Sequence, residues 1–178
     1  MTLGAYPLFL GIDPGDTSGG LGVIDNRGRY VDSIRTAGTK KKPISSAELF
    51  EWVSGWHNDF GIGLAVLEKV SAMPGQGISS TFKFGQSLGR LQMLVSAAAI
   101  PFEWHTPSNW QKAMRCRTKG DKNVTYVLAG EMFPDADIFH YNADALIMAE
   151  YARRLYHARM GAPITVPIGS LDIPVSDG

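Results

Sequence analysis

The sequence predicts a single α/β domain with a five-stranded mixed sheet, and three observations support this prediction. Strand-like apolar runs joined by short turns come first along the chain. Later runs of the same kind alternate with long segments of helical periodicity, which is typical of α/β proteins. A hydrophobic content of 44% in 178 residues is sufficient for one substantial core.

Five runs have the apolar and β-branched composition of strands. The first three are separated only by short segments rich in turn residues, Gly15 to Gly20 and Asn26 to Gly28, and are therefore expected to form an antiparallel meander. The last two each follow a helical segment. The five expected strands are Pro7 to Asp13, Leu21 to Asp25, Tyr30 to Thr36, Leu64 to Glu68 and Phe102 to Thr106.

Four segments carry apolar residues at helical spacing. The first has Ser45 and Glu48 at the positions of a capping box, and the second is stopped by Pro101. Together with the strands they define a domain over residues 1–160, followed by a tail at 161–178 with one strand-like piece, Ile164 to Ile168. The four expected helices are Ser45 to Gly61, Phe84 to Ile100, Asp121 to Met132 and Asn142 to Arg159.

Charge and composition narrow the class of protein. No long uncharged apolar run or basic leader is present, so we expect a soluble cytoplasmic protein with no membrane association. Cys116 is the only cysteine, which excludes an intrachain disulfide and a zinc site built from cysteines. The 17 basic residues balance 17 acidic ones, and this balance alone argues against a nucleic-acid partner.

The distribution of charge matters more than its sum. One segment carries five basic residues against a single acid, Asp121, and Lys40 to Lys42 form a second basic cluster. Both segments are candidates for phosphate contacts, although basic loops are also ordinary solvated surface. The five basic residues of the first segment are Lys112, Arg115, Arg117, Lys119 and Lys122.

Three carboxylates stand at the ends of predicted elements. Asp13 and Glu68 each close an apolar strand, and Asp144 opens the last helix. If the two strands are neighbours, these acids converge and provide the oxygen ligands that Mg²⁺ prefers. Taken singly, each has an ordinary role as a turn former, a surface acid or a residue favoured at a helix N-terminus.

The order of these motifs resembles the RuvC-like Holliday-junction resolvases of the RNase H-like superfamily, over about residues 8 to 155. Within that family the chain is most similar to the phage and plant-organelle branch. The resemblance rests on Gly11-Ile-Asp13-Pro-Gly15, Leu67-Glu68, Phe84-Gly85-Gln86-Ser87-Leu-Gly89, Thr106-Pro107 with Trp110 and Lys112, and His140 with Ala143-Asp144-Ala-Leu-Ile-Met-Ala149.

The resemblance implies an RNase H-like fold and a homodimeric endonuclease for recombination and repair, which cuts four-way DNA junctions by paired symmetric nicks. It implies that Asp13, Glu68 and Asp144 bind two Mg²⁺ ions per site, with Mn²⁺ as a possible substitute. Two such ions activate a water and stabilise the leaving oxygen in phosphodiester hydrolysis.

The fourth site position departs from the bacterial pattern, which has Asp or His three residues before the last acid. Tyr141 stands there and is a poor ligand for magnesium. The neighbouring His140 is therefore our candidate for the fourth catalytic residue, as a base near the attacking water or as a weak ligand. Asp137 is a further candidate, and a capping or core histidine is the ordinary alternative for His140.

The resemblance also suggests DNA contacts near the second helix. Met73 lies in the loop after Glu68, where relatives insert a residue into the junction, and Gln86 and Ser87 are expected to open the helix beside a phosphate backbone. Phe82 and Phe84 are expected in the core. The dimer contact is expected from the helix hydrophobes, unless these pack on their own sheet: Leu88, Leu91, Met93 and Leu94.

Three other interpretations remain open. An acidic strand followed by a Gly-rich hairpin also begins the actin and sugar-kinase class, but that class needs a second similar domain and the sequence offers none. A nuclease that cuts flaps or other branched DNA would have the same residues. A DNA-binding module without activity is the third possibility, because position 141 deviates from the family pattern.

Overall fold

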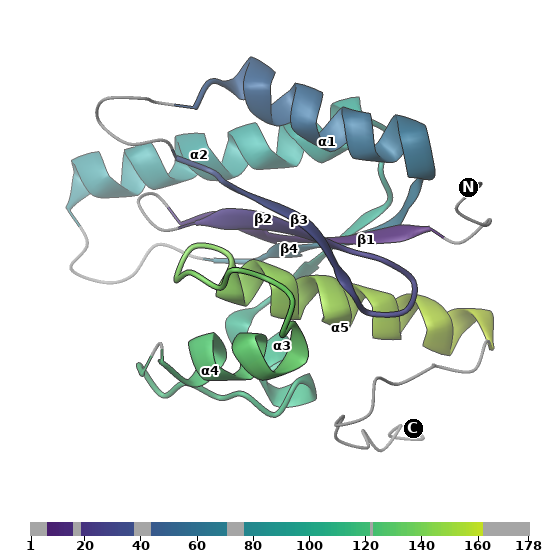
Figure 1. Ribbon diagram of the computed structural model, residues 1–178. Coiled ribbons are helices and arrows are strands. Elements are labelled where there is room, and N and C mark those ends of the chain that lie inside the picture. Colours follow the sequence, from purple (N-terminus) through teal and green to yellow (C-terminus); the bar gives the residue numbers. More distant parts are fainter. Residues whose placement is uncertain (1–6, 16–18, 38–43, 71–76, 122, 162–178) are drawn as a thin grey trace.

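The computed structural model describes residues 7–15, 19–37, 44–70, 77–121 and 123–161. A five-stranded mixed sheet in the order β3-β2-β1-β4-β5 forms its centre, as predicted. Helices cover both faces of this sheet: α1 and α2 lie on one side, and α3, α4 and α5 lie on the other (Figure 1). The strands are β1 (Leu8–Asp13), β2 (Gly20–Ile24), β3 (Tyr30–Arg35), β4 (Ile62–Glu68) and β5 (Phe102–His105).

The strand pairing follows from the lengths of the connections. The short connections leave β1, β2 and β3 antiparallel, so the predicted meander is confirmed. Helical connections of more than a dozen residues return the chain to the same end of the sheet, and β4 and β5 consequently add in parallel to β1. The helices are α1 (Ser46–Phe60), α2 (Ile78–Ala97), α3 (Pro107–Ala113), α4 (Asn123–Met132) and α5 (Ala143–Met160).

Alternation along β1 divides the core into two parts. Phe9 packs under α5, whereas Leu10 and Ile12 pack under α1 and α2. The same alternation in β4 sends Val66 to the α5 side and Leu67 to the opposite side. The position of a residue in β1 or β4 therefore determines whether its side chain faces α5 or faces α1 and α2.

The start of α1 confirms the predicted capping box. The hydroxyl of Ser45 accepts a 3.1 Å hydrogen bond from the Glu48 amide, and the Glu48 carboxylate accepts one from the Ser45 amide. These contacts satisfy amides that have no partner inside the helix. Leu49 and Val53 then face the core.

The second helix begins earlier than predicted. α2 starts at Ile78 rather than at Phe84, because nothing between Gly77 and Phe84 interrupts a helix once it is nucleated. Gln86 and Ser87 consequently lie inside the helix and not at its N-terminus. The short helix α3 was not expected, although Thr106 caps it and Pro107 begins it in the usual way.

Two glycines allow α5 to lie unusually close to the sheet. A Cβ atom on Gly11 would lie 1.9 Å from the carbonyl oxygen of Ala145, and one on Gly20 would lie 2.0 Å from that of Tyr141. Only glycine fits against backbone atoms at these distances. The close contact places the start of α5 directly over the end of β1.

The proposed tail at 161–178, including Ile164 to Ile168, lies almost wholly outside the described residues, as do Lys40 to Lys42. In the described parts of the chain, none of the helices is long and apolar enough to cross a membrane.

Candidate active site

Asp13 and Glu68 stand side by side at one end of the sheet. Ile12 pairs with Leu67 in the parallel register of β1 and β4, so the next residues along the two strands are the two acids. Neighbouring strands lie about 4.8 Å apart. Because Phe9 and Val66 face α5, the alternation of the strands directs both carboxylates to that face.

The third predicted acid lies above this strand end. Asp144 is in the first turn of α5, whose backbone contacts β1 at Gly11 and β2 at Gly20. Its carboxylate is partly buried and close to the helix N-terminus, where the helix dipole favours a negative charge. The fold therefore brings Asp13, Glu68 and Asp144 to the same end of the sheet, on the same side.

Hydrogen bonds orient two of these carboxylates. Oδ1 of Asp13 accepts a 3.1 Å bond from the amide of Gly15. Oε1 of Glu68 accepts a 2.9 Å bond from the indole Nε1 of Trp110, which is fully buried. Nothing in the sequence indicated this bond, because 42 residues separate Trp110 from Glu68.

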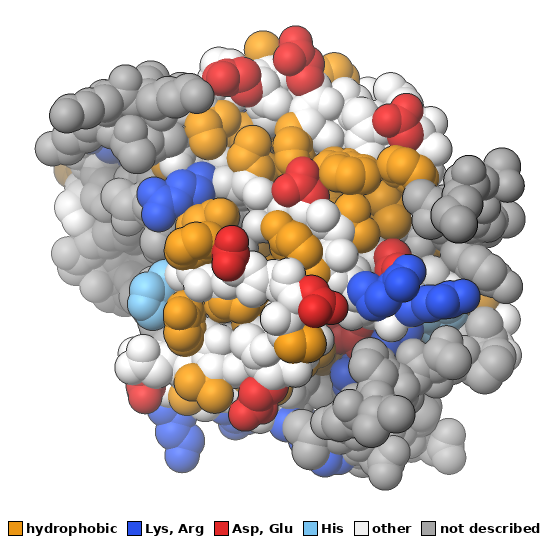
Figure 2. Space-filling view, viewed as in Figure 1, with side chains coloured by type: hydrophobic (Ala, Val, Ile, Leu, Met, Phe, Trp, Pro, Cys, Tyr) orange, Lys and Arg blue, Asp and Glu red, His pale blue; other side chains and the backbone are white. Residues whose placement is uncertain are grey.

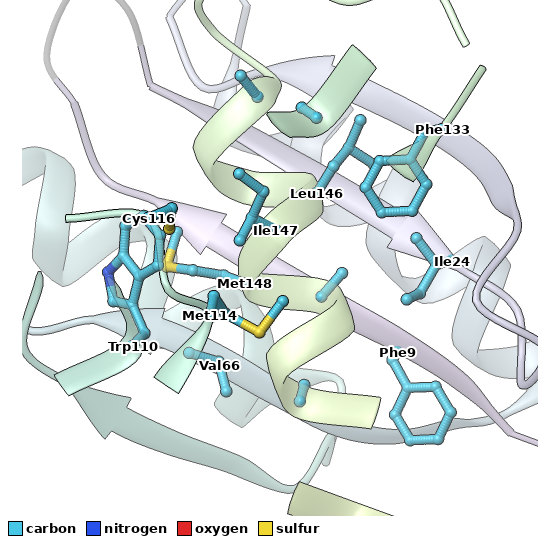
Figure 3. Close-up of a cluster of buried hydrophobic side chains, with 14 of the residues drawn as sticks. Phe9, Ile24, Val66, Trp110, Met114, Cys116, Phe133, Leu146, Ile147 and Met148 are labelled. Carbon is cyan, nitrogen blue, oxygen red and sulfur yellow. The ribbon is translucent and has the colours of Figure 1, made fainter. Parts of the chain in front are cut away.

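Cys116 lies in the core beside the site. It belongs to the same core cluster as Trp110, and both lie at the end of that cluster opposite Phe9 (Figure 3). Burial raises the pKa of the Cys116 thiol to about 12, and the negative charge of Asp144 contributes to the increase. The thiol is therefore protonated at neutral pH, and it lies within electrostatic reach of Asp144.

The three acids do not form a compact ligand cluster in their present orientations. Within the described ranges, no three His, Cys, Asp or Glu side chains lie close enough together to hold a metal ion. The set of donors nevertheless fits a hard divalent cation, because every donor is a carboxylate oxygen and all three lie at one end of the sheet.

The candidates for a fourth residue lie in the segment between α4 and α5. His140 is exposed, and its ring packs against Tyr126 of α4 with 5.0 Å between ring centroids. Tyr141 stacks on Phe139 and is covered by the guanidinium of Arg35. Asp137 is exposed, and its carbonyl oxygen accepts a hydrogen bond from the Asn142 side chain.

The predicted basic segment runs from the last turn of α3 into an exposed loop. Basic side chains gather along the lower edge of the molecule in Figure 2, below α4. Arg115 and Arg117 flank the buried Cys116, so both emerge from a segment that reaches the neighbourhood of Asp144. The exposed members of the predicted set are Lys112, Arg115, Arg117 and Lys119, whereas Lys122 lies outside the described residues.

The predicted contacts on α2 are partly corrected. Gln86 is exposed, and the hydroxyl of Ser87 donates a 3.5 Å bond to the carbonyl oxygen of Pro14, close to Asp13. Met73 lies outside the described residues. Phe82 was expected in the core but is 65% exposed, because α2 begins early enough to carry it past the edge of the sheet.

The hydrophobic residues of α2 divide between the core and the surface. Leu91 and Leu94 are buried against their own sheet, so for these two residues the alternative of packing on the sheet is confirmed. Met93 is 64% exposed, and Leu88 is half-buried. The exposed face of α2 therefore differs from the face predicted for dimer contact.

The order of the five strands and the helices on both faces of the sheet define an RNase H-like fold. The family model "Crossover junction endodeoxyribonuclease RuvC" matches residues 9–150, so the chain belongs to the RuvC family. It is an endonuclease of the crossover junction class, and nucleases of this family are metal-dependent in general.

Individual relatives agree with this assignment. The RuvC proteins of Mycobacterium leprae and Nocardioides sp. are 30% and 28% identical to the chain, over 79% of its length in both cases and over 78% and 82% of theirs. The Thermus thermophilus RuvC structure covers 87% of this chain and 97% of its own, with a TM-score of 0.62 at 20% identity. A second structure, T. thermophilus RuvC in complex with Holliday junction substrate, has a TM-score of 0.63 at 21% identity, covering 87% and 96% of the two chains.

Proposed function

We propose that this protein resolves four-way DNA junctions in the cytoplasm by Mg²⁺-dependent hydrolysis of one phosphodiester in each of two opposing strands. The observation that carries the proposal is the β1–β4 register, which sets Asp13 beside Glu68 on the face where α5 presents Asp144. The relative solved with a Holliday junction has the same fold, which supports a branched substrate.

We propose that Asp13, Glu68 and Asp144 would together hold the two divalent ions. When bound, the divalent cations supply the Lewis acidity that activates a water and stabilises the leaving oxygen. Mn²⁺ meets the same oxygen ligands and is expected to substitute. The Trp110 indole donates a hydrogen bond to Glu68, and the Gly15 amide donates one to Asp13. Two of the proposed ligands are therefore oriented before the substrate binds.

His140 is proposed as the base beside the attacking water. It lies at the surface between α4 and α5, directly before Tyr141, whose carbonyl contacts Gly20 of β2. The variant His140→Ala is expected to cut more slowly while it still binds metal. Cutting at the wild-type rate would remove His140 from the mechanism and leave Asp137 as the next candidate.

Cleavage of labelled synthetic DNA tests the main proposal. Four-way junctions, three-way junctions, flaps and linear duplexes are incubated with Mg²⁺ or EDTA, with wild type and with Asp13→Asn. Paired symmetric nicks confined to the four-way junction, and absent with EDTA or the variant, are the expected result. Equal cutting of flaps indicates a general branch nuclease, and tight binding without cutting indicates a DNA-binding module.

A second variant separates binding from chemistry. Asp144→Asn keeps the size of the side chain and removes its charge, so junction binding should persist while cutting falls by about 100-fold or more, as expected when several kcal/mol of charge stabilisation is lost. Loss of both binding and the folded state would make Asp144 structural instead.

We propose that the exposed basic loop holds the DNA backbone. Lys112, Arg115, Arg117 and Lys119 are exposed, and Lys122, Gln86, Ser87 and Met73 belong to the same predicted contact set. A phosphate contact contributes about one unit to the slope of binding against salt concentration. Arg115→Ala with Arg117→Ala should therefore reduce that slope by about two, whereas Arg27→Ala, at the far end of β2, should leave it unchanged.

We propose that the protein is a homodimer that uses the outer face of α2. Ile78 and Phe82 are 91% and 65% exposed, and Met93 lies on the same side of the helix. Gly85 and Gly89 lie between them with open space around both, so a second helix is able to approach closely there. A two-fold symmetric junction calls for two symmetric active sites, which a dimer provides.

The mass of the protein in solution tests this arrangement. Light scattering after size exclusion should give a dimer for the wild type and a monomer for Phe82→Glu. Phe50→Glu, at an exposed position of α1, is the matched control and should remain dimeric. A monomeric wild type contradicts the proposal outright.

A further inference from the structure

An aromatic pair is exposed in the segment that connects α4 to α5. The rings of Phe139 and Tyr141 are stacked, with 5.5 Å between their centroids and 12° between their planes. Phe139 is nevertheless 49% exposed. An exposed aromatic ring held parallel to another is the geometry with which proteins extend a stack of nucleobases.

Hydrogen bonds fix the backbone of this pair before any ligand binds. The buried Asn142 accepts a 2.7 Å bond from the amide of Phe139 through Oδ1, and its Nδ2 donates to Ser33 of β3 and to the carbonyl of Asp137, at 3.0 Å in both cases. The Phe139 carbonyl in turn accepts bonds from the amides of Asn142 and Ala143. The exposed ring therefore projects from an anchored backbone, which lowers the entropy lost on binding.

A positive charge accompanies the aromatic pair. The guanidinium of Arg35, at the end of β3, lies 4.8 Å from the centroid of the Tyr141 ring. Arg35 is exposed. A nucleotide presents a flat base and a negatively charged phosphate together. Stacked rings suit the base, and the guanidinium suits the phosphate.

The aromatic pair lies next to the proposed metal site. The carbonyl of Tyr141 contacts Gly20, and Gly20 is the residue of β2 that pairs with Asp13. In Figure 1 the segment runs along the end of the sheet at which β1 and β4 terminate. A strand cut at Asp13 would therefore pass close to Phe139.

We propose that Phe139, supported by Tyr141, stacks against an unpaired nucleobase of the branched DNA beside the strand to be cut, while Arg35 contacts an adjacent phosphate. This inference rests on the proposed function and adds a base contact to it. Bases at a branch point are more easily unstacked than bases inside a duplex, so the contact favours branched substrates.

A fluorescent base at single positions of the junction tests the contact. 2-Aminopurine, whose emission falls when it stacks, is placed at the crossover and, separately, in an arm. The titrations are made in EDTA, so that no strand is cut during the measurement. Wild type should change the emission at the crossover, and Phe139→Leu should remove that change and weaken binding about tenfold.

Three controls complete the design. Phe139→Trp keeps an aromatic face and should retain the signal, whereas Phe50→Leu on α1 should behave as wild type. Melting temperatures exclude unfolding of the Phe139 variants. Identical emission and affinity for wild type and Phe139→Leu would overturn the inference.

Cleavage by wild type on the same junctions separates this inference from the proposed function. If wild type cuts the junction and Phe139→Leu binds it equally well, only the stacking contact fails. If the emission depends on Phe139 but wild type cuts no branched DNA, the contact stands as a nucleobase site and the proposed activity fails.

Discussion

The indole Nε1 of Trp110 donates a 2.9 Å hydrogen bond to Oε1 of Glu68, so a fully buried core residue orients a carboxylate of the candidate site. The bond connects the middle of the short helix α3 to the last residue of β4. It satisfies the one polar atom of the indole and holds Glu68 on the face toward α5. Core packing and site geometry therefore depend on the same side chain.

Replacement of the Trp110 indole by a phenyl ring should lower the cleavage rate by more than the loss of folded protein explains. Trp110→Phe keeps an aromatic ring but removes the donor, and loss of such an orienting contact lowers metal affinity or activity by about 10- to 100-fold. Stability should fall by about 1–3 kcal/mol. Cleavage rates and urea denaturation provide the two measurements.

The matched control for this variant is Trp104→Phe, which removes an indole from the opposite core. It should leave the cleavage rate near that of wild type. Equal losses of activity in the two variants would contradict a specific role for the Trp110 bond.

Addition of a methyl group at Gly11 should destabilise the fold strongly. The new Cβ would lie 1.9 Å from a backbone oxygen of α5. To remove this clash, the backbone of β1 or of α5 would have to move. We expect Gly11→Ala to lose at least about 3 kcal/mol, the upper part of the range for overpacked cores. Thermal and urea unfolding measure the loss.

Gly55→Ala is the matched control, because nothing lies within 4 Å of the position that its Cβ would take. In the middle of α1, alanine should stabilise the protein by about 0.5–1 kcal/mol. Similar stability of the two variants would show that α5 is able to move away from β1.

The sequence was sufficient to predict the sheet and the positions of Asp13 and Glu68 at the ends of their strands. Alternating apolar residues and short turns are local patterns, and they can be recognised without the rest of the chain. The α2 start was misplaced because the Ser and Thr residues before Phe84 resemble a loop. The bond between Trp110 and Glu68 and the contact of Gly20 with Tyr141 join residues far apart in the chain, and no local pattern encodes them. The stacked pair Phe139 and Tyr141 lacks periodicity for the same reason.

The thiol of Cys116 should be inert in the folded protein. Its pKa of about 12 arises mainly from burial and secondarily from the charge of Asp144. In EDTA at pH 8, a thiol reagent should modify the native protein very slowly and the unfolded protein at once. Asp144→Asn removes the second cause, so the native reaction should become faster.

An unchanged rate in Asp144→Asn would mean that the two side chains do not interact. Since the reagent needs the same local opening in both proteins, the ratio of their rates isolates the effect of charge. Unfolding curves of the two proteins confirm that their global stabilities are similar.

Stability should decrease in mild acid because of His157. Burial lowers the pKa of this ring, the charge of Arg153 acts in the same direction, and Glu150 opposes both. The folded protein therefore favours the neutral ring, while the unfolded chain takes up a proton near pH 6.5. The contribution of His157 is complete above about pH 6.5 and is lost as the pH falls from there toward the lowered pKa.

His157→Phe removes this titration and suits the neighbouring rings of Phe9 and Tyr156. Urea denaturation at pH 7.5 and 5.5 should show a smaller loss of stability in the variant than in wild type. A loss of the same size in both proteins would show that other groups determine the acid sensitivity.

The position of Asp144 in the chain has a consequence for biosynthesis. Asp13 and Glu68 leave the ribosome long before α5 is synthesised. This last helix carries the third acid and buries the face of β1 that includes Phe9. Until that helix docks, the nascent chain lacks a full set of carboxylates and exposes an apolar strand surface. With Asp144 as a metal ligand, as proposed above, cutting activity is expected only once the last helix is in place, and completion of the domain then times the onset of cutting.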